Sequence, residues 1–143
     1  MVVKQLSVFI ENKSGRLVQI TEILGKNKID IRAVSIADTT SFGILRLIVD
    51  DPDRAKSVLR EAGFTVSITE VIAIAIEDEP GGLSKALRVL SNAQIGVEYM
   101  YAFLSKEDKT AYVILRVEDN DEAARVLQAA GIKCLSSEDI CNI

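Results

Sequence analysis

Glu11-Asn12-Lys13-Ser14-Gly15-Arg16-Leu17 and Glu77-Asp78-Glu79-Pro80-Gly81-Gly82-Leu83 are two versions of one heptapeptide, 66 positions apart in the sequence. Both follow an alternating apolar stretch, and both place a glycine two residues before a leucine. The same offset relates Leu24 to Leu90 and Ile29 to Ile95, whereas residues 49–63 match residues 117–131 at an offset of 68. A repeat that holds over so many positions indicates an internal duplication.

Each repeat has the periodicity of a strand, a helix, two strands, a helix and a strand. Apolar residues at every second position predict strands over residues 6–10 and 72–76. Apolar residues three and four apart predict helices from Leu17 to Leu24 and from Leu83 to Leu90. The remaining expected elements are strands over 31–37, 45–49, 64–68 and 111–117 and helices over 55–62 and 123–130. No linker separates the repeats, because residues 64–77 are nearly continuous β sequence.

Capping residues support the second helix of each repeat. Asp51, which a proline follows, suits the N-cap, and Gly63 and Gly131 suit the left-handed residue after a helix. The order of elements predicts an α+β fold of two tandem ferredoxin-like βαββαβ units, each with an antiparallel sheet and both helices on one face. We therefore expect one domain over residues 1–69 and a second over residues 70–143.

Composition narrows the class of function. The net charge of -4 and the pI of about 4.9 argue against nucleic acid as the main partner, because such domains usually carry a basic stripe. Histidine is absent, which removes the commonest general base and the commonest metal ligand. The chain has no nucleotide-binding, nucleophile-elbow or metal-spaced motif. We expect no catalytic residue, no metal and no cofactor.

Two features bear on the cellular location. No apolar run approaches the roughly 20 residues that span a bilayer, and the start of the chain lacks the pattern of a signal peptide. We therefore expect a cytoplasmic protein with no membrane partner. Cys134 and Cys141 are too few for a disulfide framework, and we interpret both as structural or incidental.

The heptapeptide is the best candidate for binding chemistry. The first N–H groups of a helix have no hydrogen-bond partner within the helix and carry partial positive charge, so they can bind a carboxylate. Glycine lets a ligand approach the backbone, and the side-chain amide of Asn12 both donates and accepts. A purely structural alternative stays open, in which Asn12 and Asp78 cap helices and Gly15 and Gly81 only form turns.

The repeated pattern resembles the signature of ACT domains: an Asn or acidic residue after a strand, two further residues, glycine, any residue and leucine. Ile29-Asp30-Ile31 is similar to the family's entry to the second strand. The resemblance covers approximately residues 3–69 and 70–137. ACT domains are regulatory modules that typically bind amino acids at interfaces between two domains, and the resemblance implies the same class of ligand for this chain.

In amino-acid-binding ACT domains, the ligand is contacted by a loop Asn and by a polar residue that opens the second strand. By position, the resemblance implies Asn12 and Asp30 in the first repeat and Asp78 and Gly96 in the second. Gly96 has no side chain, so the two sites should not be equivalent. The expected ligand-binding residues are Asn12, Lys13, Ser14, Gly15, Arg16, Leu17, Asp30, Ile31, Asp78, Glu79, Pro80, Gly81, Gly82 and Leu83.

Four strand residues have less specific interpretations. Tyr99 and Tyr101 either line a pocket or pack within a strand, as strand aromatics usually do. Arg46 and Arg116 lie opposite the apolar strand face, where they either pair with acidic residues across the sheet or face solvent or an interface.

The open face of the first sheet predicts an interface. Phe9, Ile44 and Ile48 alternate away from the helix-facing residues and should form apolar patches, which usually mark protein contacts. We therefore expect a homodimer. The main functional hypothesis is an amino-acid-binding protein that regulates a metabolic enzyme in trans. The alternatives are an architectural module that oligomerises or docks on an enzyme without a ligand, and an unrecognised enzyme.

Overall fold

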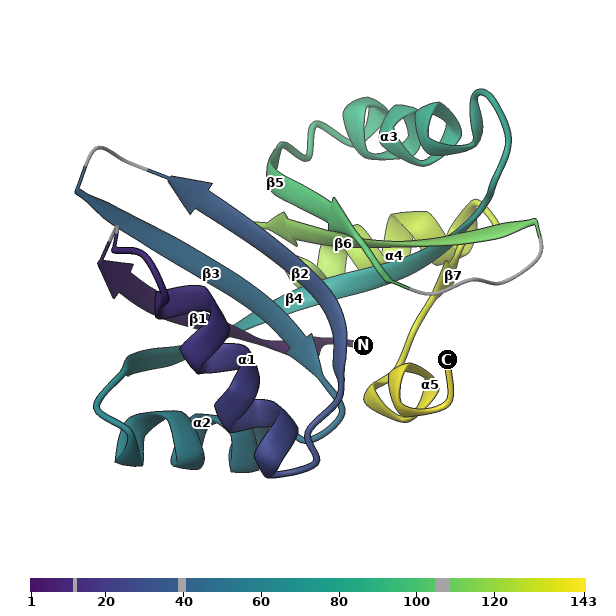
Figure 1. Ribbon diagram of the computed structural model, residues 1–143. Coiled ribbons are helices and arrows are strands. Elements are labelled where there is room, and N and C mark those ends of the chain that lie inside the picture. The colour runs from purple at the N-terminus through teal and green to yellow at the C-terminus, as the bar shows by residue number, and fades with distance from the viewer. Residues whose placement is uncertain (12, 39–40, 105–108) are drawn as a thin grey trace. The chain divides into compact units, whose positions relative to one another are not determined.

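The computed structural model describes residues 1–11, 13–38, 41–104 and 109–143. The chain divides into two compact units (Figure 1). The first unit comprises residues 4–69, and the second comprises residues 70–143 together with residues 1–3.

The first unit contains the six elements expected of one repeat. In chain order they are β1 (Val3–Glu11), α1 (Arg16–Lys26), β2 (Ile31–Asp38), β3 (Phe42–Val49), α2 (Pro52–Glu61) and the first part of β4 (Thr65–Glu77). The strand order is β2-β3-β1-β4, and β3 is antiparallel to both β1 and β2. The register pairs Leu6 with Leu47 and Val8 with Leu45, which places these apolar side chains on one face of the sheet.

The second unit repeats this plan. It contains the rest of β4, then α3 (Gly82–Asn92), β5 (Val97–Ala102), β6 (Thr110–Val117), α4 (Asn120–Ala129), β7 (Lys133–Cys134) and α5 (Ser137–Cys141). Its strand order is β5-β6-β4-β7, and each neighbouring pair is antiparallel. The tandem ferredoxin-like plan predicted from the sequence is confirmed. The short helix α5 is an addition that the repeat pattern does not predict.

The last strand of the first repeat and the first strand of the second are one element. We predicted nearly continuous β structure from Phe64 to Glu77, and this is confirmed: β4 runs without a break from Thr65 to Glu77. The segment contains no glycine or proline and is rich in β-branched residues, so nothing in it ends the extended conformation.

Each unit has its own hydrophobic core between its two long helices and one face of its strands (Figure 1). In the first unit, Ile20 and Leu24 of α1 and Leu59 of α2 pack with side chains of β1 and β3. In the second, Leu90 of α3 and Leu127 of α4 pack with side chains of β4 and β6. Leu24 and Leu90 are 0% and 1% exposed, which confirms that they are equivalent buried positions.

The predicted caps of the second helix in each repeat are confirmed. The Asp51 carboxylate accepts a hydrogen bond from the Arg54 N–H at 3.3 Å, and a proline opens α2. Gly63 and Gly131 follow α2 and α4 with φ of +93° and +81°, a conformation that glycine adopts without steric cost.

The open face of the first sheet exposes large apolar side chains at one end. Phe9 is exposed, as predicted, and the neighbouring Phe42 is exposed as well. Of the other two residues predicted for this face, Ile44 is half-buried and Ile48 is buried.

In the part of the chain that the structure describes, no helix is long and apolar enough to cross a membrane. In the described residues, neither Cys134 nor Cys141 forms a disulfide. Cys134 belongs to the core of the second unit, where burial raises the pKa of its thiol and makes it a poor nucleophile.

Candidate ligand site at the strand-to-helix loops

The two strand-to-helix loops follow the same backbone path. In the first, the Lys13 N–H donates to the Glu11 carbonyl at 2.7 Å, and the Arg16 N–H donates to the Lys13 carbonyl at 3.4 Å. In the second, the equivalent bonds run from Glu79 to Glu77 at 2.9 Å and from Gly82 to Glu79 at 3.0 Å. The duplication has therefore preserved the geometry of the turn as well as its sequence pattern.

Glycine occupies the N-cap of the helix after each loop. Gly15 and Gly81 have φ of +89° and +87°, and neither α1 nor α3 has a side-chain cap or an acidic residue in its first turn. By contrast, Asp51 and Asp119 cap the second helix of each unit. Asp78 does not occupy the N-cap of α3, contrary to the capping alternative, whereas Asn12 lies outside the described residues. The starts of α1 and α3 thus keep the partial positive charge that favours an anion.

The first loop carries more positive than negative charge. Lys13 Nζ lies 2.8 Å from Glu11 Oε2, and Arg16 Nη1 donates to Gln19 Oε1 at 3.3 Å. A hydrogen bond and charge interaction from Lys13, with a smaller contribution from Arg16, lower the pKa of Glu11. The lowered pKa favours the ionised form of Glu11, and with Lys13 and Arg16 the loop keeps a net positive charge.

The second loop has the opposite balance. Glu77, Asp78 and Glu79 precede its glycines, and Lys85 Nζ lies 3.7 Å from carboxylate oxygens of both Glu77 and Glu79. A hydrogen bond between the two glutamates lowers the pKa of Glu77 and raises that of Glu79, and Lys85 also lowers the pKa of Glu77. The start of α3 is thus a poorer place for an anionic group than the start of α1.

Gly82 adds a steric difference between the loops. A Cβ atom at this position would lie 2.0 Å from the Glu77 carbonyl oxygen, which is far inside van der Waals contact. The turn of the second loop is therefore tight enough to require glycine at the first helical residue. The first loop accommodates Arg16 at the equivalent position and so gains a cation there.

A hollow lies beside each loop, at the end of the sheet where the turn after the unit's second helix also runs. The first hollow, of about 240 Å³, is lined by Phe9, Ile10, Glu11, Arg16, Phe42, Ala62, Gly63, Phe64 and Thr65. The second hollow, of about 260 Å³, is lined by Ala75, Ile76, Glu77, Gly82, Lys85, Val89, Ala130, Gly131 and Ile132. The sequence pattern predicted the loop residues that line one side of each hollow. It did not predict the lining residues around Gly63 and Gly131, although both glycines were predicted as helix caps.

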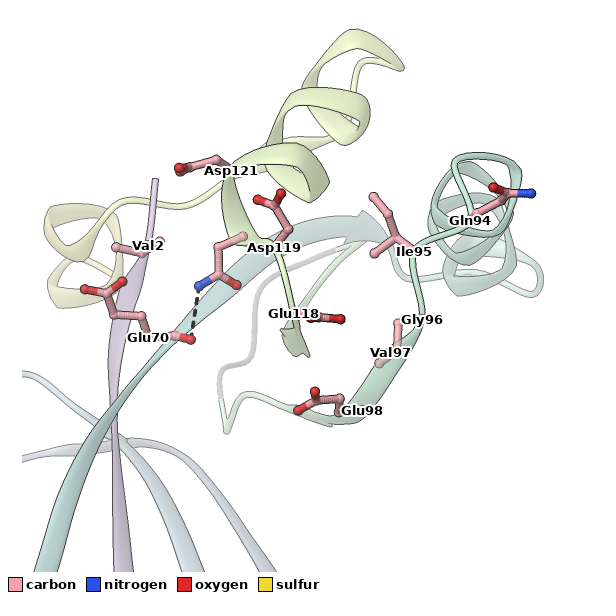
Figure 2. Close-up of a pocket in the computed structure, with 11 residues that line it drawn as sticks. Val2, Glu70, Gln94, Ile95, Gly96, Val97, Glu98, Glu118, Asp119 and Asp121 are labelled. Atoms are coloured by element: carbon pink, nitrogen blue, oxygen red, sulfur yellow. Dashed lines mark hydrogen bonds between the residues drawn. The ribbon is translucent and has the colours of Figure 1, made fainter.

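A larger hollow of about 830 Å³, here called the acidic hollow, lies in the second unit (Figure 2). It contains Gly96, the counterpart of Asp30, and five carboxylates: Glu70, Glu98, Glu118, Asp119 and Asp121. One of these carboxylates has a structural role, because Asp119 caps α4. Beside it, the backbone carbonyl of Glu70 accepts a hydrogen bond from Asn120 Nδ2 at 3.2 Å. In the described ranges, no set of three or more His, Cys, Asp or Glu is arranged to hold a metal ion.

The register separates Asp30 and Ile31 from the loop of their own unit. Glu11 pairs with Phe42 at one end of β3, whereas Ile31 pairs with Val49 at the other end. Seven residues of strand span roughly 23 Å, at about 3.3 Å per residue. One amino-acid ligand therefore cannot touch the first loop and Asp30 within a single unit. Asp30 instead lies 3.3 Å from Arg32.

The strand residues with open interpretations are also placed. Tyr99 and Tyr101 stack on each other with ring centroids 6.5 Å apart, and neither lines any of the three hollows above. Arg116 pairs with Glu98 on the neighbouring strand at 3.6 Å, as expected for an arginine facing acidic residues across the sheet.

Comparison with solved structures supports the tandem fold. A crystal structure of protein BT0572 from Bacteroides thetaiotaomicron is 41% identical and covers 100% of this chain and 98% of its own, with a TM-score of 0.93. The regulatory subunit of aspartate kinase from Thermus thermophilus, in a ligand-free form, has a TM-score of 0.67 at 16% identity, over 89% of this chain and 91% of that one. The corresponding subunit from Thermus flavus gives 0.61 at 14% identity, over 90% and 92%.

The two kinase subunits are too distant in sequence to show more than the fold. No curated protein matches the chain. The family is decided by sequence: the model of the ACT domain pair matches residues 1–143, the whole chain, which therefore belongs to the ACT domain pair family.

Proposed function

We propose that this protein is a regulatory sensor that binds an amino acid at the start of α1 and has no catalytic activity of its own. One observation carries the proposal: both repeats keep a glycine at the helix N-cap, with no side-chain cap. An N-terminus left open in this way offers backbone N–H groups to a carboxylate. The duplicated loop then has a use beyond forming a turn.

The first loop is the better site in this proposal. Its cations, Lys13 and Arg16, attract the ligand's α-carboxylate, whereas three carboxylates in the second loop repel it. The expected contacts are the two loops, residues 12–17 and 78–83, with Asn12 orienting the ligand. Asp30 and Ile31 remain in the proposal only as contacts from a second copy of the chain, since the register keeps them away from their own loop.

The proposed partners follow from the family and from the exposed surface. ACT-containing relatives include proteins named as regulatory subunits of aspartate kinase, which supports a metabolic enzyme as the regulated partner.

The exposed Phe9 and Phe42 support self-association, and we propose a homodimer. We also keep residues 1–69 and 70–143 as the proposed domains. Light scattering at micromolar concentration tests the dimer, and a monomer there would contradict it. The cytoplasmic location stays a prediction.

A thermal-shift screen of the full chain against the twenty common amino acids tests the function. A ligand at about 100 times its Kd stabilises the native state by roughly 2.7 kcal/mol. For a chain of this size, the Tm should rise by about 5–11 °C. Only one or a few amino acids should have this effect. If none does, the protein is better explained as an architectural module that binds without a small ligand.

Matched loop variants locate the site. Asn12→Ala should abolish most of the shift and leave the Tm of the free protein within a few degrees, whereas Asp78→Ala should matter less. A shift that survives Asn12→Ala but not Asp78→Ala would preserve the function and move the site to the second loop.

A further inference from the structure

The first and second hollows are one feature, present twice. The repeat offsets of 66 and 68 map Ile10, Glu11 and Gly63 of the first hollow onto Ile76, Glu77 and Gly131 of the second. Their volumes, about 240 and 260 Å³, are nearly equal, although the side chains around them differ. A depression that survives such divergence at the same place in both repeats is a candidate site in its own right.

Each hollow presents one carboxylate and one cation. The carboxylate is Glu11 or Glu77, at the end of the strand, and the cation is Arg16 or Lys85, on the following helix. Arg16 is replaced by Gly82 in the second repeat, while Gln19 is replaced by Lys85. These two helix positions are three residues apart and therefore neighbours, as the hydrogen bond from Arg16 to Gln19 shows. The cation has moved by one helical turn but has stayed at the hollow.

The apolar walls of the two hollows differ in kind. The first hollow is lined by three phenylalanines, Phe9, Phe42 and Phe64, two of which are half exposed to solvent. The second hollow has Ala75, Val89 and Ile132 and no aromatic side chain. Exposed aromatic rings at the rim of a small hollow add little to the stability of the fold, and they offer a surface on which another ring can pack.

We propose that the first hollow binds a free aromatic α-amino acid, with its carboxylate on Arg16, its ammonium group on Glu11 and its ring against the phenylalanines. The proposal rests on the proposed function and names the ligand class and its contacts. The ion pair between Glu11 and Lys13 is exposed and worth little, so the ligand's ammonium group can replace Lys13 at a small cost. The second hollow has the same pair of charges and an aliphatic wall, which suits a smaller side chain.

Isothermal titration calorimetry of the full chain with L-phenylalanine and L-tyrosine tests the assignment. Arg16→Gln and Glu11→Gln should each weaken binding by about ten- to a hundredfold, as expected for a lost hydrogen bond to a charged group. Lys26→Gln, at the far end of α1, should leave the Kd unchanged. Phenethylamine lacks the carboxylate and 3-phenylpropionate lacks the ammonium group, so both should bind far more weakly than phenylalanine.

The cation exchange supplies a rescue test. Arg16→Gln combined with Gln19→Lys copies the arrangement of the second repeat and should restore most of the binding that Arg16→Gln alone removes. If an amino acid binds but neither the Arg16 variant nor the Glu11 variant weakens that binding, the ligand does not occupy the first hollow. The proposed function would then remain intact. If binding depends on Arg16 but the affinity is higher for L-leucine than for L-phenylalanine, the assignment of an aromatic ligand is wrong. If no amino acid binds at all, the proposed function fails together with this inference.

Discussion

Leu24→Ala and Leu90→Ala test the account of the two cores most directly. Leu24 on α1 and Leu90 on α3 occupy matched positions, are 0% and 1% exposed, and belong to separate core clusters. Replacing a fully buried leucine by alanine costs about 2–5 kcal/mol, because transfer free energy is lost and a cavity remains. At about 2–4 °C per kcal/mol for a chain of this size, each Tm should fall by roughly 4–20 °C.

Urea unfolding, followed by circular dichroism at the helix band, measures the two free energies. Leu17→Ala is the matched control on α1, because Leu17 is 44% exposed and its loss should change the stability by at most about 0.5 kcal/mol. Since the two cores share no residue, the effects of Leu24→Ala and Leu90→Ala should add within about 0.5 kcal/mol in the double variant. If Leu24→Ala is no more destabilising than Leu17→Ala, the helix face assigned to the core is wrong.

Three further predictions concern local structure. Gly82→Ala should distort the second loop and lower the Tm, because its Cβ would collide with the carbonyl of Glu77; an unchanged Tm would refute this tight turn. Asp119→Ala should cost about 1 kcal/mol in urea unfolding through loss of the α4 cap, and a neutral result would show that solvent replaces it. Hydrogen bonds from Ser136 lower the pKa of Asp139, so its ionised form contributes stability above the unfolded pKa of about 3.9, and this stability is lost as the pH falls through the folded pKa. Asp139→Asn should therefore remove this part of the acid dependence below about pH 4, measured by urea unfolding, and an unchanged dependence would contradict the role of the cap.

The fold could be predicted because its signals are local and occur twice. Alternation, helical spacing and the caps at Asp51, Gly63 and Gly131 each fix a short segment, and the duplication lets one copy check the other. The long strand β4 could also be predicted, because no breaker separates the strand pattern that ends the first repeat from the one that starts the second. Helix α5 begins at the Ser136–Asp139 capping box. This signal is present in the sequence but lies outside the repeated pattern, so comparing the two repeats does not reveal it.

The site was only half predictable, for a different reason. The loop residues are adjacent in sequence and form one pattern, whereas Phe42, Phe64 and Thr65 reach the first hollow from β3 and from the turn after α2. Such proximity depends on strand register, which no single segment encodes. The same register places Asp30 at the far end of the sheet, so Asp30 cannot contact a ligand held at the first loop of its own unit.

The two repeats have diverged in charge while conserving shape. Both loops keep the same two hydrogen bonds, the left-handed glycine and the adjoining hollow. Arg16 at the first helical residue became Gly82, and three carboxylates gathered in the second loop. Fold stability alone does not call for this difference, because these side chains are largely exposed and surface pairs contribute little. The proposed function would account for it: the first loop keeps the positive charge that a ligand carboxylate needs, and the second loop is not held to the same charge.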